Sequence, residues 1–138
     1  MMNAQPDGLT KWHRFVSEKG KDMQALAEAL ADDVLLRSPV LWKPKEGKAT
    51  TMLYLISVAR VLEDFTYRRQ FVGDNAVVLE FSARVGSLGL KGVDIIQFNA
   101  AGQIVDFEVM VRPANGLQAL GAAMAQQLAS ADRPEVGS

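Results

Sequence analysis

One carboxylate stands out because its neighbours along the chain are apolar. Residues 93–98 are rich in β-branched and aromatic side chains, which is typical of a β-strand. Side chains alternate along a strand, so Asp94 shares a face with Ile96 and Phe98. Burial disfavours the charged form of a carboxyl group, which makes Asp94 a candidate acid or hydrogen-bond donor. The alternative is that Asp94 pairs with an arginine or with backbone groups and ties its strand to a helix.

His13, the single histidine, is the second catalytic candidate. An imidazole titrates near neutral pH, so it can act as a base or as a proton shuttle. The alternative interpretation of His13 is an ordinary helix residue, solvated or half-buried, one turn from Leu9 and beside Trp12.

Residues 65–72 are aromatic and alternate enough to form a strand, on which Tyr67 and Arg69 share a face. If that face points inward, Tyr67 supplies a hydrogen-bond donor. Arg69 then supplies a counter-ion for the candidate acid or for a ligand carboxylate. If the face points outward, Arg68 and Gln70 point inward instead, and the sequence does not decide between the two.

Composition excludes several classes of site. At 138 residues the chain has the size of one domain with a real core, and no apolar run is long enough to cross a membrane. Its net charge of −1 gives no electrostatic footprint for nucleic acid or an anionic membrane. The absence of cysteine excludes disulfides, thiolate metal sites and a Cys nucleophile, and one histidine excludes a His-rich metal site. We therefore expect no metal and no cofactor. Because the first 12 residues lack an apolar signal core, we expect a cytoplasmic location.

The elements that must position these residues begin with helices, predicted from apolar residues at helical spacing. Asp22 is expected to cap the second helix, Thr50 or Thr51 the third, and Asn115 the last. The predicted helices cover residues 8–19, 23–31, 52–62 and a C-terminal segment after residue 115.

The strands follow the helices. A short strand over residues 34–38 is stopped by Pro39, and residues 39–49 are expected to form a loop. Because helices precede an antiparallel meander, the predicted class is α+β: a cone-shaped, curved antiparallel sheet packed against three N-terminal helices, plus a C-terminal helix. The predicted meander strands cover residues 65–72, 76–85, 93–98 and 104–111, in a single domain over 8–128 with a disordered tail over 129–138.

A strongly curved sheet covered by helices leaves a cavity between the two layers. Small molecules usually bind in mainly apolar cavities of this type. Trp42 is expected either to close this pocket as a lid, or to pack in its loop or in a dimer contact. The other expected lining residues are Phe15, Val34, Leu36, Ser38, Leu55, Tyr67, Arg69, Leu79, Phe81, Ile96, Phe98, Phe107, Val109 and Val111.

Three short motifs carry a resemblance to a known family. They are Ala31-Asp32-Asp33-Val34, Ser38-Pro39, and Asp94-x-x-x-Phe98-Asn99-x-x-Gly102-x-Ile104. Over roughly residues 9–112 the chain resembles the nuclear transport factor 2-like superfamily, especially its bacterial SnoaL-like and ketosteroid-isomerase-like members. The resemblance implies a cystatin-like cone, usually dimeric, with a pocket at its open end.

The resemblance also implies roles for single positions. Ketosteroid isomerases keep a general-base Asp just before the proline that ends the first strand; here that position is Ser38, which cannot abstract a carbon-bound proton near neutral pH. Their oxyanion-hole Tyr falls on Phe15, which has no donor, whereas their second donor, an Asp kept protonated by an apolar site, matches Asp94. Asp94 with an inward Arg69 would be a partial version of the epoxide-hydrolase arrangement.

These observations predict a domain that binds a small apolar or amphipathic molecule. As an enzyme it would be a cofactor-free isomerase, cyclase or hydratase that uses Asp94 as acid or orienting group. The alternative is a non-catalytic ligand-binding or interaction domain, dimeric through its outer sheet face, with a pocket filled by its own side chains. A third interpretation pairs that face with another protein. The expected outer-face residues are Glu80, Ser82, Arg84, Asp106, Glu108 and Arg112.

Overall fold

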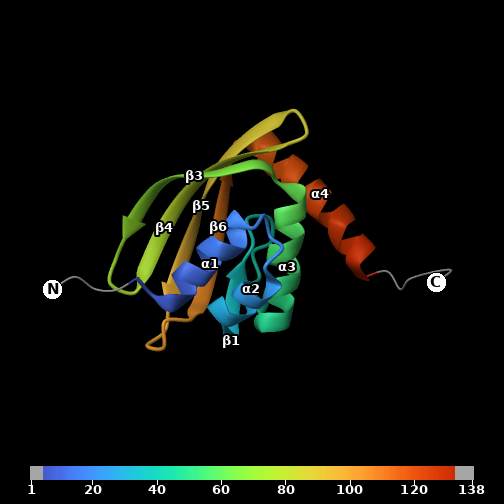
Figure 1. Ribbon diagram of the computed structural model, residues 1–138. Helices are drawn as coiled ribbons and strands as arrows, with labels where there is room; N and C mark the ends of the chain where they lie inside the picture. The colour runs from blue at the N-terminus through green and yellow to red at the C-terminus, as the bar shows by residue number, and fades with distance from the viewer. Residues whose placement is uncertain (1–4, 133–138) are drawn as a thin grey trace.

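The computed structural model describes residues 5–132, in which four helices and six strands form an α+β fold (Figure 1). The predicted class and the curved sheet are confirmed. The elements are α1 (Asp7–Ser17), α2 (Met23–Ala29), β1 (Leu30–Arg37), β2 (Lys45–Glu46), α3 (Lys48–Val61), β3 (Glu63–Val72), β4 (Ala76–Val85), β5 (Leu88–Phe98), β6 (Ile104–Arg112) and α4 (Ala114–Asp132).

The six strands form one sheet in the order β2-β1-β6-β5-β4-β3. Strands β3 to β6 make the predicted antiparallel meander. Strand β1 pairs parallel with β6, so the sheet is mixed rather than wholly antiparallel. Helices α1, α2 and α3 lie against the hollow side of the sheet, and α4 runs beside α3 (Figure 1).

Strand β1 begins at Leu30 rather than at residue 34, and α3 begins at Lys48 rather than at residue 52. Two further differences in the N-terminal half concern α2 and the predicted loop. Helix α2 ends at Ala29 instead of Ala31, because Leu30 already pairs with Ile104 of β6. The predicted loop over 39–49 contains the short strand β2, which pairs with β1. Both differences come from strand pairing between distant segments, which helical spacing along the sequence does not report.

The helix caps were predicted with mixed success. Asp22 caps α2 as expected, because its Oδ1 accepts a hydrogen bond of 3.0 Å from the backbone N–H of Ala25. Helix α3 is preceded by Gly47, at φ 93°, so both expected threonines lie inside the helix. Asn115 likewise lies inside α4.

The expected tail begins too early. Helix α4 continues through residues 129–132, so this part of the expected disordered tail is helical. The remainder of that tail, residues 133–138, lies outside the described residues.

Strand β3 carries two irregularities that bend the edge of the sheet. One shift in register falls between Glu63 and Thr66, next to Asp64, whose φ is 53°. The other falls between Tyr67, which pairs with Phe81, and Gln70, which pairs with Leu79. A bulge adds a residue to one strand, bends it and strengthens its twist. The bulges therefore help to curve β3 over the helices.

The core lies between the hollow face of the sheet and the helices. The predicted alternation on β5 is confirmed, since Ile96 and Phe98 are buried. On β6 a register shift changes the pattern: Phe98 pairs with Ile104, which is 0% exposed and joins the buried face. Val105, which strict alternation with Phe107 would place on that face, is only half-buried. A second cluster, around Phe81 and Leu120, packs under α4.

Among the described residues, no helix has the length and hydropathy needed to cross a membrane. The cytoplasmic location stays a prediction.

Thr51 offers a direct test of the packing around α3. Its side chain is 0% exposed, and its hydroxyl oxygen has no hydrogen-bond partner among the described residues. Valine has nearly the same shape without the buried hydroxyl, so we expect Thr51→Val to raise the free energy of unfolding by about 1 kcal/mol in urea denaturation. Thr50→Val, at the half-buried neighbouring position, is the control. A destabilised Thr51→Val protein would contradict this reading of the hydroxyl.

Candidate functional site

Three side chains from distant segments form a hydrogen-bonded chain inside the fold. The hydroxyl of Tyr67 donates to Oδ2 of Asp94 over 2.6 Å, and Nε1 of Trp12 donates to the Tyr67 oxygen over 2.9 Å. An indole N–H can only donate, so the Tyr67 oxygen is the acceptor there and its own hydrogen goes to Asp94. Tyr67 therefore points inward, which the sequence left open, and Oδ1 of Asp94 takes no part in this chain.

Packing of α1 and β3 against the sheet brings the three side chains together. Asp94 lies in the middle of β5, opposite Leu79 of β4 and Val109 of β6, and is only 5% exposed. Helix α1 crosses the hollow face with the Trp12 ring against Phe107, at 4.8 Å between centroids. The three residues therefore meet only when helix and edge strand close over the same sheet face.

Burial sets the protonation of this centre. It raises the pKa of Asp94 from 3.8 to about 7, against the hydrogen bond from Tyr67, which favours the carboxylate. Burial, together with the neighbouring Asp94 carboxylate, raises the pKa of Tyr67 well above its ordinary value of 10. Near neutral pH the phenol therefore keeps its proton, while Asp94 exists in both forms.

His13 lies beside this centre without bonding to Asp94. Its ring meets the Tyr67 ring edge-to-face, at 5.8 Å between centroids, and partial burial lowers the pKa of the imidazole. Within residues 5–132 the His13 side chain makes no hydrogen bond. The proton-shuttle role of His13 stays a prediction.

A cavity of about 400 Å³ adjoins Asp94, between α1, α3 and β3; we call it the Asp94 cavity. Lys19 and Asp64 are exposed, so they mark its rim, and Asp94 is the buried ionisable residue on its wall. The lining is otherwise mainly apolar: Trp12, Phe15, Val16, Gly20, Leu55, Val58, Ala59, Leu62 and Phe65.

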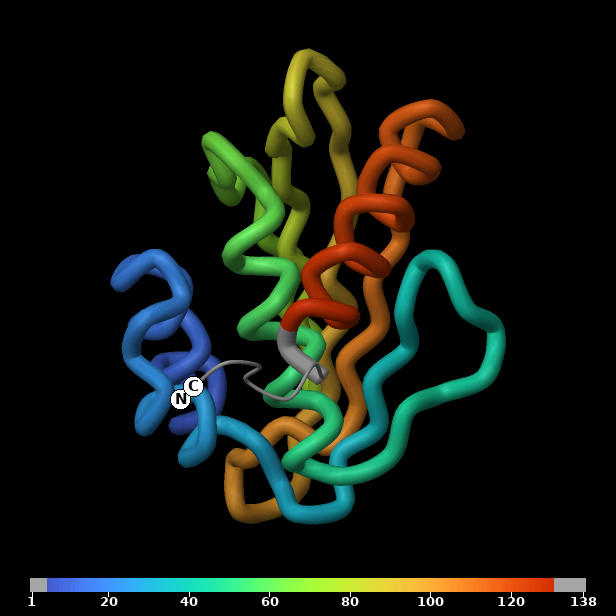
Figure 2. The backbone as a smooth tube through the Cα atoms, turned by 90° about the vertical axis from the view of Figure 1, so that its right-hand side faces the viewer, coloured from blue at the N-terminus to red at the C-terminus, as the bar shows by residue number. Residues whose placement is uncertain are grey.

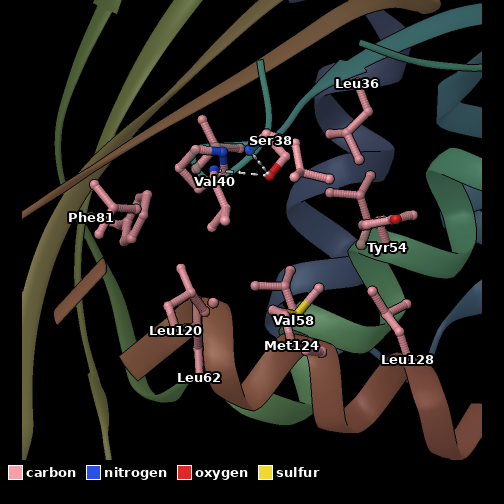
Figure 3. A pocket seen from close by; sticks show the side chains of 17 residues that line it. Leu36, Ser38, Val40, Tyr54, Val58, Leu62, Phe81, Leu120, Met124 and Leu128 are labelled. Atoms are coloured by element: carbon pink, nitrogen blue, oxygen red, sulfur yellow. Dashed lines mark hydrogen bonds between the residues drawn. The ribbon is translucent and has the colours of Figure 1, made fainter. Parts of the chain in front are cut away.

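A second cavity, of about 230 Å³, lies between α3, α4 and the inner face of the sheet; we call it the α3–α4 cavity (Figure 3). Ser38, at the end of β1, lies on its wall. The Ser38 Oγ accepts hydrogen bonds from the backbone N–H groups of Val40, at 3.0 Å, and Leu41, at 3.4 Å. Three residues line both cavities: Leu55 and Val58 of α3, and Leu62, which follows the helix.

The predicted pocket residues divide among these places. Tyr67 belongs to the hydrogen-bonded chain, and Phe15 lines the Asp94 cavity. Leu55 lines both cavities. Five of the predicted residues line the α3–α4 cavity: Leu36, Ser38, Phe81, Val109 and Val111. Five others lie in the hydrophobic core: Val34, Leu79, Ile96, Phe98 and Phe107.

Two predicted pocket residues lie elsewhere. Arg69 points outward and holds Glu80 with two hydrogen bonds, of 2.8 and 2.6 Å, because the second β3 bulge turns it to the outer face. The predicted counter-ion for Asp94, and with it the partial epoxide-hydrolase arrangement, is therefore wrong. Trp42 is 99% exposed and lines neither cavity, although its loop contributes to the α3–α4 wall.

Trp12 is the site residue that sequence reasoning missed. Its helical spacing from Leu9 and Phe15 places it on the apolar stripe of α1, and it is buried. The overlooked signal is the polar handle of tryptophan, since a buried indole N–H usually finds an acceptor.

The outer sheet face provides a contrast with Asp94. Glu80 is also buried, but the hydrogen-bonded Arg69 guanidinium lowers its pKa to about 2, and Lys91 adds a second cation at 3.5 Å. Glu80 is thus held ionised by its cations, whereas Asp94, whose hydrogen-bond partner is a neutral phenol, is close to half-protonated near neutral pH.

No group of three or more potential metal-ligating side chains occurs in the part of the chain that the structure describes.

Replacing Tyr67 tests what its hydroxyl does to the acid. Tyr67→Phe removes the hydrogen bond that favours the carboxylate, so we expect the pKa of Asp94 to rise above about 7. The measurement is a pH titration of the Asp94 carboxyl carbon by NMR. Tyr54→Phe, at the other tyrosine, is the matched control and should leave that pKa unchanged. An Asp94 pKa that falls in Tyr67→Phe would contradict the assigned donor direction.

Asp94 also predicts a pH dependence of stability with a definite sign. Its pKa is about 7 in the folded chain against an ordinary 3.8, so above pH 4 the folded state holds a proton that the unfolded state has released. The free energy of unfolding should therefore fall as pH rises, by about 3 kcal/mol from pH 5 to pH 8. The measurement is urea denaturation at both pH values.

Asp94→Asn is the comparison for this test. The stability that Glu80 contributes is fully present above its ordinary pKa of 4.5 and is therefore constant from pH 5 to pH 8. His13, whose pKa is lowered from 6.5, contributes stability that increases as pH rises. Both contributions persist in the variant, so the difference between the two proteins isolates Asp94. Equal pH dependence in both proteins would contradict the raised pKa.

Comparisons with known proteins agree with this fold. No protein-family model and no curated protein matches the sequence. Among solved structures, the chain is similar to a steroid delta-isomerase from Pseudomonas aeruginosa, with 45% identity and a TM-score of 0.89 over 94% of this chain and 96% of that one. It is also similar to an uncharacterised protein with a cystatin-like fold from Silicibacter pomeroyi, with 31% identity and a TM-score of 0.84 over 91% and 87% of the two chains.

A nuclear transport factor 2-like protein of unknown function from Cytophaga hutchinsonii shares the fold alone. Its identity is 14% and its TM-score 0.63, over 83% of this chain and 96% of that one. The similarity to the first two structures extends along nearly the whole chain, well beyond the three short motifs. The chain therefore belongs to the nuclear transport factor 2-like superfamily.

Proposed function

We propose that the chain binds a small, mainly apolar molecule in the Asp94 cavity and that Asp94 acts on its polar group as an acid. One observation carries the proposal: a carboxyl group with a pKa of about 7 is buried on the wall of a mainly apolar cavity, with a tyrosine hydroxyl as its hydrogen-bond partner. Perturbed acids in cavities are typical of functional sites.

The two carboxyl oxygens of Asp94 have different tasks in this proposal. Oδ2 stays hydrogen-bonded to Tyr67, which Trp12 holds in turn, so the plane of the carboxyl group is fixed. Oδ1 is the atom that carries the exchangeable proton. In the neutral form it donates to an acceptor such as a carbonyl oxygen, and in the ionised form it accepts a proton from the bound molecule.

The enzyme class that we propose is a cofactor-free isomerase. It is supported by the 45% identity to the Pseudomonas aeruginosa protein described as a steroid delta-isomerase. Isomerisation of an unsaturated ketone breaks one C–H bond, shifts the double bond and returns the proton to another carbon, so it needs no oxidant or reductant. Since Ser38 and Phe15 replace two of the three groups of ketosteroid isomerases, Asp94 carries the proton exchange here.

The alternative function is ligand binding without catalysis, within a homodimer. The same two replacements favour it, because Ser38 cannot serve as the general base and Phe15 has no hydrogen-bond donor for an oxyanion. The dimer contact would use the outer sheet face. That face carries the ion pairs of Arg37 with Asp106 and of Arg84 with Glu63 and Asp64, and Met110 of β6 is exposed.

Turnover of an unconjugated steroid ketone is the direct test of the isomerase. The conjugated product absorbs in the ultraviolet, so its formation is followed by absorbance. We expect Asp94→Asn to lower kcat about 100-fold or more, since a positioned acid or base contributes that much. Asp74→Asn, in the exposed turn between β3 and β4, is the matched control and should keep the full rate.

The outcomes separate the two functions. Turnover that persists in Asp94→Asn would overturn the role of Asp94. Binding of the steroid without turnover, with saturable shifts at the Trp12 indole N–H in NMR, would support the non-catalytic alternative.

A further inference from the structure

We propose that the segment after β1 docks on the surface of a bilayer that contains anionic phospholipids. Three consecutive apolar residues, Val40-Leu41-Trp42, make the contact; we call them the docking tip. The proposal is independent of the function assigned to Asp94. It rests on the exposure of the three side chains, on the hydrogen bonds of their backbone, and on the lysines that follow them.

The docking tip concentrates apolar surface that faces water. Trp42 is 99% exposed, and Val40 and Leu41 are 50% and 46% exposed, although tryptophan is highly buried on average. Figure 2 shows the segment between β1 and α3 (teal) projecting from the body beside α4. A stable dimer buries about 800 Å² on each partner, more than a projecting tip of three side chains presents. A fluid lipid surface accepts such a tip, and tryptophan is enriched at membrane–water interfaces.

The backbone of the docking tip suits an environment that is poor in water. Inside a bilayer, every backbone N–H group without a hydrogen bond is costly. The prolines at positions 39 and 44, on either side of the tip, have no N–H group. Within the tip, the Ser38 Oγ accepts from the N–H groups of Val40, at 3.0 Å, and Leu41, at 3.4 Å. Only the N–H of Trp42 is left for water or a lipid headgroup.

The charges around the docking tip suit an anionic surface. Residues 37 to 48 include four cations and one acid, whereas the whole chain has a net charge of −1. The cations at the two ends of this segment pair with carboxylates. Lys43 and Lys45 make no ion pair among the described residues, so they are available to phospholipid phosphates. The net charge, which gives no footprint for an anionic membrane, therefore averages over a local excess of cations.

Helix α4, on which the docking tip rests, is uncharged almost to its end. A Cβ built on Gly121 would lie 3.5 Å from a Val40 methyl group, so the tip and the helix are neighbours. From residue 114 to residue 131 the helix has no charged side chain, and it exposes small ones such as Ala122 and Ala125. Such a surface approaches lipid headgroups without stripping water from an ion. Because Val40 and Leu41 also line the α3–α4 cavity, docking would place that cavity beside the bilayer.

Vesicle binding by the full chain tests the proposal, and tryptophan fluorescence reports the docking tip directly. The vesicles contain phosphatidylcholine alone or with an equal part of phosphatidylglycerol. On the mixed vesicles, Trp42 emission should shift to shorter wavelength and be quenched by lipids brominated on the acyl chains, because the indole leaves water. Trp12, which is 4% exposed, should be unaffected.

Variants assign the binding to the docking tip when the bound fraction is measured by sedimentation with the vesicles. Trp42→Ala should weaken binding about tenfold, the effect of one large apolar side chain. Lys43→Gln combined with Lys45→Gln should weaken it about tenfold on the mixed vesicles only. Phe71→Ala, at a 55% exposed aromatic residue of β3, is the matched control and should bind as the natural chain does.

Three outcomes would overturn the proposal. The first is binding that is as tight in Trp42→Ala as in the natural chain, and the second is quenching by brominated lipid of the tryptophan that remains in this variant. The third is a dimer in lipid-free sedimentation that Trp42→Ala dissociates, which would assign the tip to a second copy of the chain. Asp94→Asn should bind vesicles normally, whatever its effect on turnover, so a failure of the isomerase leaves this test intact.

Discussion

The buried carboxyl group of Asp94 is the constraint around which the concave side of this protein is arranged. A carboxylate taken out of water without a counter-ion is unstable, and the protein responds with a hydrogen bond from Tyr67 and a pKa near 7 rather than with an arginine. Tyr67 reaches Asp94 because β3 curls over the hollow face, and Trp12 completes the contact from α1. Sheet curvature, helix position and acid chemistry are therefore coupled.

The two faces of the sheet treat their buried acids in opposite ways. Glu80 and Asp94 lie on adjacent strands, but Glu80 faces outward to Arg69 and Lys91 and stays ionised, whereas Asp94 faces inward to apolar side chains. The bulge in β3 after Tyr67 produces this division, because it turns Tyr67 inward and Arg69 outward on the same strand. One extra residue in the edge strand β3 thus places Tyr67 inside the fold, where it bonds to Asp94, and Arg69 on the outer face, where it forms an ion pair with Glu80.

Helix α3 divides the interior into two cavities of different chemistry. Leu55, Val58 and Leu62 line both cavities, so the two cavities adjoin at these side chains. The acid lies on one side of these side chains and Ser38 on the other. Two positions that the family resemblance would assign to one reaction centre, Ser38 and Asp94, therefore line different cavities here.

The sequence by itself determined the α+β class, the meander and the burial of Asp94, because these depend on the periodicity of apolar residues along the chain. It also placed Trp12 and Phe15 on a buried helix face. Only the tertiary structure decided that Tyr67 points inward and Arg69 outward, that Leu30 pairs with Ile104, and that Ser38 and Asp94 line different cavities. A bulge reverses the alternation of a strand, and parallel pairing joins residues far apart in the chain. Neither leaves a periodic signal in the sequence, so the partners of a side chain are settled only when the layers pack.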